Sequence, residues 1–421
     1  MRGRRLQTRS RRISGTKGLR AVVFFLCIAA TFAGLAASAP SAGSAANTTG
    51  VSVSGPVYAW FDDDAGQLGI GVVGPQYSSL APVASKMPMG VSSAAVASGQ
   101  SHSLAVTSTG GVYAWGFNGS GQLGNGGATN QSVPVPVAIP ARVRITSVAA
   151  GWDQSLALTS TGTVLAWGLD RYGELGNGSL KNSHVPVPVM LPAGIKVVAI
   201  AAGQYHSLAV TSTGLVYAWG DNLYGQLGNG TVVNSSVPVR IPLPGGARAT
   251  AVGAGDSHSL VVTSTGRIFA WGRNDFGQLG DGTTTQSDSP VAVHLPPGVV
   301  ASEVVAGGVS PTAAHPESDY SVALTATGAI YAWGGNSHGQ LGNGSKAGSE
   351  LPVLTHLPAG IAAVAVGAAS NWARLLTADG HIYIWGKKGL LAPSLTKLPA
   401  GLRATAISTG ADGEQMLAIL S

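Results

Sequence analysis

The strongest constraint on the fold is a sequence pattern that recurs seven times along the chain. Each copy contains a short strand-like run, Y-A-W or a close variant, that ends in tryptophan. The tryptophans are Trp60, Trp115, Trp167, Trp219, Trp271, Trp333 and Trp385. Four of their six intervals are 52 residues, and the other two are 55 and 62. A constant period over nearly the whole chain predicts a repeat architecture, in which each copy is one structural unit.

Each copy contains several short apolar runs and no stretch of helical periodicity. In one copy the runs are Val197–Ala202, Ser207–Thr211, Leu215–Trp219 and Val237–Ile241. A Ser-Thr-Gly turn separates the second run from the third, which is typical of a β-hairpin. Pro238 and Pro242 flank the fourth run, and because proline cannot donate to a ladder hydrogen bond, we expect that strand at the outer edge. Four short strands in about 52 residues predict a propeller blade.

The two ends of the chain complete each other. The first Y-A-W run, Val57–Trp60, has no H-S-L-A-V run before it, and one further run of that type, Gln415–Leu420, follows the last tryptophan. Pairing the N- and C-terminal strands therefore uses every copy and leaves no open sheet edge, unlike an open solenoid. We expect an all-β, seven-bladed β-propeller over residues 47–421, with a ten-residue insertion within 307–319.

The repeat also has a family resemblance. Residues 102–126 (HSLAVTSTGGVYAWGFNGSGQLGNG) and 258–282 (HSLVVTSTGRIFAWGRNDFGQLGDG) carry H-S-L, Y-A-W-G and G-Q-L-G in a constant register. This pattern resembles the repeats of the regulator of chromosome condensation family, and the resemblance covers residues 50–421. It implies a seven-bladed β-propeller. The seventh copy departs from the pattern at Gly386–Ala392 (GKKGLLA), so the resemblance leaves the conformation of that loop open.

The resemblance implies two kinds of function. Eukaryotic members are nuclear nucleotide-exchange factors for a small GTPase and bind chromatin. A secreted β-lactamase inhibitor protein, also built as such a propeller, is the nearer analogue for an exported chain. It supports a binding function and does not identify the target.

The first 46 residues predict export. Eight basic residues lie within residues 1–20, followed by an apolar run over Ala21–Ala37 and a stretch rich in Ala and Ser. This order is that of a secretory signal peptide, with cleavage after Ala46 favoured over Ala39, which precedes a proline. An uncleaved membrane anchor is the alternative, because 17 apolar residues are just long enough to span a bilayer. We expect a secreted or cell-surface protein that touches a membrane only through this segment.

The formal net charge of +6 belongs to this leader. The other 16 Lys and Arg residues face all 18 Asp and Glu residues, so the remainder of the chain carries a charge near −2. Nucleic-acid binding needs clustered Lys and Arg to neutralise phosphates. The charge pattern therefore argues against a nucleic-acid partner.

No catalytic constellation is apparent in the sequence. Cys27, the single cysteine, lies in the leader, and there is no G-x-S-x-G, H-E-x-x-H or phosphate-binding loop. We expect no enzyme activity, no cofactor and no metal. Asp62–Asp64 could bind calcium but lack EF-hand alternation, so a solvated turn is favoured. The recurring His102, His206 and His258 are expected to hydrogen-bond to local backbone.

Positions that vary between copies indicate the candidate site. Three consecutive copies place an aromatic residue five positions after the repeat tryptophan, and the loop between the first two strands adds two more. In a four-stranded meander both loops emerge on the same face. We predict a protein-binding face on this side, since clustered aromatics with few Lys and Glu are typical of interface hot spots. Its residues are Trp152, Tyr172, Tyr205, Tyr224, Phe276 and His338.

Alternatives to this site remain open. The rings could instead fold back onto neighbouring loops. The same rings could stack on sugars in a carbohydrate- or cell-wall-binding protein. A polysaccharide-active enzyme would need paired carboxylates, for which Asp153, Asp221, Asp256 and Asp275 are in suitable loops. The favoured reading is an exported, non-catalytic, monomeric module that binds a protein partner of unknown identity.

Overall fold

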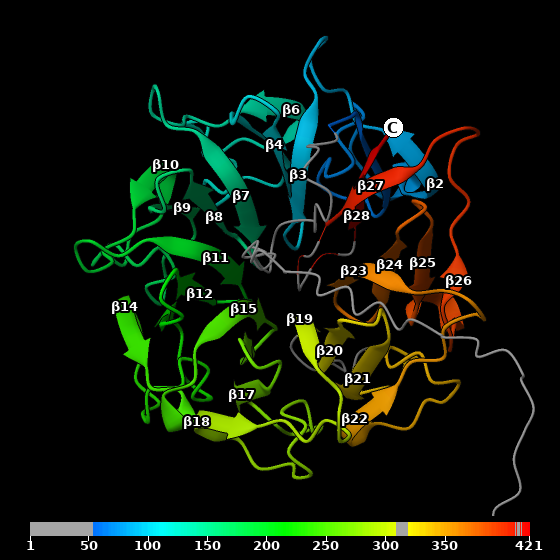
Figure 1. Ribbon diagram of the computed structural model, residues 1–421. Helices are drawn as coiled ribbons and strands as arrows, with labels where there is room; N and C mark the ends of the chain where they lie inside the picture. Colours follow the sequence, from blue (N-terminus) through cyan, green and yellow to red (C-terminus); the bar gives the residue numbers. More distant parts are fainter. Residues whose placement is uncertain (1–53, 309–318, 409, 411–412, 414) are drawn as a thin grey trace, which may run out of the picture. The chain divides into compact units, whose positions relative to one another are not determined.

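The computed structural model describes residues 54–308, 319–408, 410, 413 and 415–421. These residues all belong to one compact unit, 39–421. They form seven four-stranded antiparallel sheets around a common centre (Figure 1). The predicted seven-bladed β-propeller is confirmed. The predicted leader and most of the predicted insertion, residues 309–318, lie outside the described residues.

Each blade is an antiparallel meander. Its four strands lie side by side, with the first strand at the centre of the ring and the last at the rim. The innermost strands, which contact their counterparts in the adjacent blades, are β3 (Ser93–Ser98), β7 (Ile145–Ala150), β11 (Val197–Ala202), β15 (Ala249–Ala254), β19 (Ala301–Gly307), β23 (Ala363–Ala368) and β27 (Ala404–Ile407). The second strands are β4 (His102–Thr107), β8 (Gln154–Thr159), β12 (His206–Thr211), β16 (His258–Thr263), β20 (Tyr320–Thr325), β24 (Ala373–Thr377) and β28 (Gln415–Leu420).

The third strands carry the repeat tryptophans. They are β5 (Val112–Gly116), β9 (Val164–Gly168), β13 (Val216–Gly220), β17 (Ile268–Gly272), β21 (Ile330–Gly334), β25 (Ile382–Trp385) and β1 (Val57–Phe61). The outer strands are β6 (Gln131–Pro136), β10 (Ser183–Pro188), β14 (Ser235–Ile241), β18 (Ser287–Ala292), β22 (Ser349–Leu354), β26 (Ser394–Leu395) and β2 (Ser79–Ala84). The proline-containing strands therefore lie at the outer edge, as predicted from Pro238. We number the blades 1 to 6 from β3–β6 to β23–β26.

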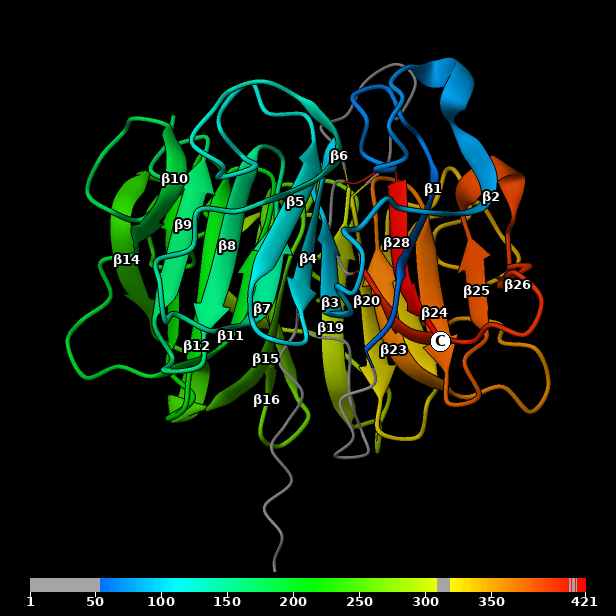
Figure 2. The ribbon, with the colours of Figure 1, turned by 90° about the horizontal axis from the view of Figure 1, so that it is seen from above.

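Blade 7 closes the ring with strands from both ends of the chain. Its order is β2-β1-β28-β27. Strand β1 pairs with β28 from Val57 opposite Ile419 to Phe61 opposite Gln415. In Figure 2 the blue β1 and the red β28 lie side by side. The predicted pairing of the chain ends is confirmed.

Helical structure is limited to single turns in the described part of the chain. The three 3₁₀ turns are η1 (Pro75–Tyr77), η2 (Pro244–Gly246) and η3 (Lys387–Gly389). Turn η3 occupies the segment where the seventh copy loses G-Q-L-G and whose conformation the repeat pattern left open. Across residues 54–308 and 319–421, wherever the structure is described, no helix is both long and apolar enough to cross a membrane.

The repeat tryptophans join each blade to the one before it. The indole Nε1 of Trp219 donates to the Glu174 carbonyl of blade 2, and that of Trp271 donates to the Gln226 carbonyl of blade 3, both at 2.8 Å. All seven of these indoles are fully buried. These indoles therefore pack between blades. The exception is Trp60, which follows the altered blade 6 loop and whose Nε1 has no hydrogen-bond partner among the described residues.

The first glycine of G-Q-L-G has a positive φ in every copy that retains the motif. Gly277, for example, has φ +81°, and a Cβ there would lie 2.5 Å from the Cα of Glu350 in the next blade. Only glycine fits this approach between blades.

The recurring histidines bond to the next blade, so the expectation of local backbone bonds was wrong. His206 Nε2 lies 2.9 Å from Ser259 Oγ, and Ser259 Oγ donates to the Gln226 carbonyl at 2.8 Å. Because the hydroxyl hydrogen goes to the carbonyl, the imidazole must donate. Burial lowers the pKa of His206 to about 3, so the ring is neutral at physiological pH. The same geometry recurs at His102 and His258.

Replacing Ser259 with alanine should destabilise the propeller by about 1–3 kcal/mol, because the buried Nε2–H of His206 loses its acceptor. The free energy of unfolding in urea is the measurement. Ser264→Ala, in an exposed turn, is the control and should change it by less than about 0.5 kcal/mol. Equal stabilities of the two variants would show that the interblade bond contributes nothing.

Candidate binding face

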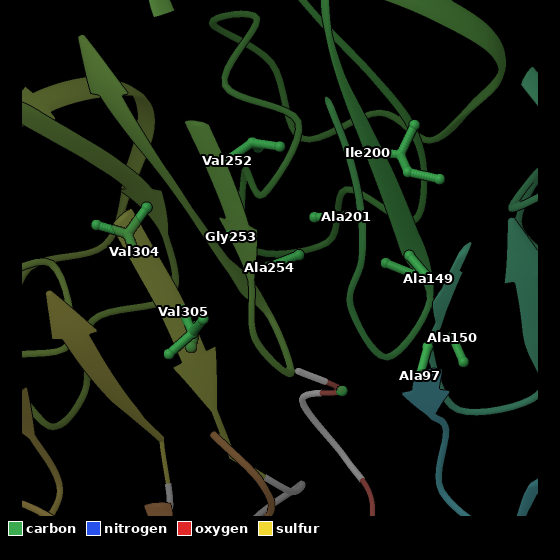
Figure 3. Close-up of a pocket in the computed structure, with 13 residues that line it drawn as sticks. Ala97, Ala149, Ala150, Ile200, Ala201, Val252, Gly253, Ala254, Val304 and Val305 are labelled. Carbon is green, nitrogen blue, oxygen red and sulfur yellow. The ribbon is translucent and has the colours of Figure 1, made fainter. Parts of the chain in front are cut away.

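Among the described residues, the cavity at the centre of the ring is lined without a polar side chain. The side chains that line it are small and apolar and come from five innermost strands (Figure 3). Its cavity volume is about 30 Å³. Ligand sites usually occupy about 300–1,000 Å³ and include placed polar groups. This cavity is therefore smaller and less polar than a typical ligand site.

The long loop between the third and outer strands of a blade is held by a buried asparagine. Asn222 Oδ1 accepts from the Leu227 amide at 2.9 Å, and Asn222 Nδ2 donates to the carbonyls of Thr231 and Val233 at 2.9 and 3.0 Å. The Tyr224 amide donates to Gln226 Oε1 at 2.9 Å. These bonds hold the backbone of the variable aromatic position in a defined turn.

An open groove crosses the loops of blades 2, 3 and 4 on the predicted face. Its volume is about 580 Å³. Three of the predicted aromatic residues line it, together with two of the carboxylates considered for catalysis and one arginine: Tyr172, Tyr205, Tyr224, Asp221, Asp256 and Arg273. The loops between first and second strands and between third and fourth strands thus contribute to one surface.

The predicted aromatic residues form two groups. In the first, the ring of Tyr205 contacts Trp152 at a centroid distance of 5.9 Å and Tyr172 edge-on at 5.5 Å. In the second, the guanidinium of Arg273 lies 5.1 Å from the ring centroid of Tyr224 and 5.8 Å from that of Phe276.

His338 lies on the corresponding loop of blade 5, with its Nδ1 3.0 Å from Ser337 Oγ. Like the other five predicted residues, it is half-buried. It does not line the groove, and neither do Trp152 and Phe276. Some packing of rings onto neighbouring rings and cations does occur, and it leaves part of each ring accessible to a partner.

Sequence reasoning missed Arg273, which links Tyr224 to Phe276. Its Nη2 pairs with Asp275 at 2.7 Å, and its Nη1 lies 3.8 Å from the buried Asp319 of blade 5. The arginine therefore has two carboxylates as partners and fixes one end of the groove. The signal in the sequence was its position two residues after Trp271, where the other copies carry different residue types.

Sequence reasoning also missed Glu174. It occupies the glutamine position of G-Q-L-G, is fully buried and accepts from the Tyr172 amide at 2.7 Å. Burial raises its pKa to about 7, and the nearby Asp170 and Asp221 add to the rise. The deviation from G-Q-L-G to G-E-L-G at residues 173–176 was visible in the sequence.

The two remaining carboxylates of the enzyme alternative have structural partners. Asp153 Oδ1 accepts from Gln122 Nε2 at 2.5 Å, across the boundary between blades 1 and 2. Burial raises the pKa of Asp153 to about 6. Asp275 is the partner of Arg273. Only Asp221 and Asp256 share the groove.

The Asp62–Asp64 turn is not simply solvated, which corrects the expectation. Asp63 is fully buried, and its Oδ1 accepts from the Leu68 amide at 2.9 Å, as Asn222 does in its own loop. Asp64 is exposed. Within the described ranges, no group of three or more His, Cys, Asp or Glu residues is placed to hold a metal ion.

Fold and face together define the class: a seven-bladed β-propeller whose sequence repeats set the blades and whose variable loops form one surface. A family model described as the RCC1-like domain matches residues 33–345, and a model of the single regulator of chromosome condensation (RCC1) repeat matches residues 327–372. The chain belongs to the RCC1-like domain family.

Relatives within this family are diverse. The ultraviolet-B receptor UVR8 of Arabidopsis thaliana is 33% identical over 73% of this chain and 67% of its own length. The human E3 ubiquitin-protein ligase HERC2 is 32% identical over 74% of this chain, which corresponds to only 6% of the ligase.

Solved structures share the fold. Human WBSCR16 has a TM-score of 0.74 at 23% identity, over 88% of this chain and 99% of that chain. Prp20p of Saccharomyces cerevisiae, described with its binding to Gsp1p and histones, has a TM-score of 0.74 at 21% identity, over 89% of this chain and 92% of that chain.

Proposed function

We propose that this protein is an exported, non-catalytic interaction module that presents the face of blades 2 to 5 to a protein partner. The observation that carries the proposal is the groove lined by Tyr172, Tyr205 and Tyr224, where the aromatic residues that vary between repeats converge. Aromatic rings that are held in place but partly accessible lose little conformational entropy on binding and are frequent hot spots. The small apolar cavity that the described residues form at the centre of the ring has no polar side chain with which to bind a ligand.

Two further considerations support this function. A protein with the same fold, Prp20p, is described by its binding to Gsp1p and histones. The basic segment at residues 1–20 and the apolar run behind it support export. The target could be extracellular, as for the secreted β-lactamase inhibitor propeller, and a monomeric ring suffices to present the face.

The test is capture of partners from the producer's culture supernatant and wall fraction by the tagged full chain. The triple variant Tyr172→Ala/Tyr224→Ala/Phe276→Ala should lose at least 90% of a captured partner, because it removes rings from both aromatic groups. Quantitative mass spectrometry of the retained proteins is the measurement, and thermal unfolding must show that the variant is folded.

A matched control removes exposed apolar side chains elsewhere. Tyr77, Leu80 and Leu395 are 43%, 69% and 56% exposed and lie in blades 7 and 6. Their triple alanine variant should retain every partner. Equal capture by the parent and the Tyr172/Tyr224/Phe276 variant would refute the proposed face. Retention on purified wall polysaccharide alone would favour the sugar-binding alternative, and release of sugar from it would favour the enzyme.

A further inference from the structure

The blade 2 loop carries a buried carboxylate where most of the other loops carry a glutamine amide. The position of Glu174 is glutamine in the loops of blades 1, 3, 4, 5 and 7. In blades 1, 3 and 4 this glutamine donates its amide hydrogen to a carboxylate, as Gln226 Nε2 does to Asp221 at 2.8 Å. Glu174 has an oxygen where those residues have the donor. This Oε1 is fully buried and has no hydrogen-bond partner among the described residues.

Negative charge accumulates around this oxygen. Asp170 and Asp221 are both close enough to raise the pKa of Glu174 by electrostatic repulsion. Asp170 replaces the loop asparagine found in blades 1, 3, 4 and 5, and its buried Oδ2 also has no hydrogen-bond partner among the described residues. Asp221 is held by the neutral amides of Gln226 and Asn234. The arginine at the other end of the groove is already engaged by Asp275 and Asp319.

The walls of the groove suit an organic cation. Tyr172 and Tyr205 lie at the acidic end, and ring faces attract Lys and Arg head groups while apolar surface packs their methylene stems. Leu223 and Val232, which are 65% and 53% exposed, form an apolar rim. A volume of about 580 Å³ is sufficient for one long side chain. An anion would meet the carboxylates, and the described acids do not form a metal cluster.

We propose that the groove receives a Lys ammonium or Arg guanidinium of the protein partner, against Asp221 and the rings of Tyr172 and Tyr205, with the buried carboxylate of Glu174 behind the Tyr172 backbone. This inference rests on the proposed function and adds the chemistry of the partner. The partner's cation supplies positive charge beside Asp221, and it offsets the buried charge of Glu174 through space without contacting it. An interface with a buried, compensated charge is specific, because a neutral side chain leaves the carboxylates unpaired.

The test uses small probes with blocked ends on the full chain. N-acetyl-L-arginine amide and N-acetyl-L-lysine amide should bind saturably in the millimolar range, followed by NMR or tyrosine and tryptophan fluorescence. N-acetyl-L-citrulline amide has nearly the same shape as the arginine probe without its charge, and it should bind at least tenfold more weakly. Raising the salt concentration should weaken only the charged probes.

Variants of the carboxylates in and behind the groove test whether the cation binds there. Asp221→Asn and Glu174→Gln should each weaken arginine-amide binding at least fivefold, and Glu174→Gln restores the residue found in five other loops, so it should fold. Asp379→Asn, at the exposed partner of His381 in blade 6, is the matched control and should leave binding unchanged. Equal binding of the citrulline probe, unchanged binding in both groove variants, or no saturable binding would each overturn the inference.

A failure of the cationic-recognition proposal can be distinguished from a failure of the proposed function. If a partner is captured by the parent and lost by the aromatic triple variant, yet arginine amide neither binds nor elutes it, the interaction face stands and the cationic recognition falls. If arginine amide binds but no partner depends on the aromatic residues, the proposed function falls instead.

Discussion

Deletion of residues 404–421 is expected to abolish cooperative folding of the propeller. The deletion removes β27 and β28, so β1 loses its partner over Val57–Phe61 and the ring opens between blades 6 and 1. The deleted Leu417 and Ile419 are fully buried, and each large core side chain lost costs about 2–5 kcal/mol. Together with the newly exposed strand edges, this exceeds the total stability of about 5–15 kcal/mol typical of a domain.

The measurement is thermal unfolding by circular dichroism with size-exclusion chromatography. We expect the truncated chain to show no sharp transition and to elute as aggregates. A synthetic peptide of residues 404–421 added in trans is the control, and it should restore a cooperative transition because the missing strands can pair from outside. A truncated protein that melts within a few degrees of the parent would show that ring closure is dispensable.

Glu174→Gln is expected to stabilise the protein by about 3 kcal/mol at pH 8 and by little at pH 4. Burial raises the pKa of Glu174 from its ordinary 4.5 to about 7. The folded state therefore binds a proton that the unfolded chain releases, and the stability of the parent falls as the pH rises from 4.5 to 7. At about 1.36 kcal/mol per pKa unit, the difference above pH 7 is about 3 kcal/mol.

Urea unfolding of both proteins across this pH range measures the effect. Glu350→Gln, at an exposed glutamate of blade 5, is the control and should show no pH-dependent difference from the parent. If the gap between parent and Glu174→Gln is the same at pH 4 and pH 8, the ionisation of Glu174 does not cause it.

The expected effects of Glu174 on stability and on binding both arise from its buried carboxylate. A buried carboxylate that destabilises the free protein, at a position where other copies carry glutamine, breaks the local rule of the repeat. Such departures are expected at functional sites, where stability is exchanged for binding. Glu174→Gln should therefore increase stability and decrease arginine-amide binding in the same protein.

The repeat pattern predicted the fold nearly to the residue. Strand β11 was expected at Val197–Ala202 and lies there, and β28 was expected at Gln415–Leu420 and lies there. The prediction succeeded because corresponding residues of the seven copies occupy the same environment in each blade. Residues that the blade requires therefore recur at a period of about 52, and the other positions vary. The same comparison identifies the first glycine of G-Q-L-G as a recurring position, and the positive φ of Gly277 shows why it recurs.

Contacts between blades were harder to predict. The bond from His206 to Ser259 joins residues 53 positions apart, and the periodicity gives no indication that the imidazole reaches across the blade boundary instead of binding its own backbone. The burial of Asp63 was missed for a related reason, because a run of three aspartates reads as solvated until its loop is aligned with those of the other copies.

The chain's own order of residues determined the number of blades, the strand at each edge, the closure by the two termini and the face on which the variable aromatics lie. These follow from local periods of two residues within a strand and about 52 residues between blades. The folded ring decided which of those residues meet. It brought Trp152, Tyr172 and Tyr205 together and placed Arg273 between Tyr224 and Phe276. It also buried Glu174 near Asp221. The physical reason is that distances between loops on different blades depend on how the sheets pack and not on the spacing of the loops along the chain.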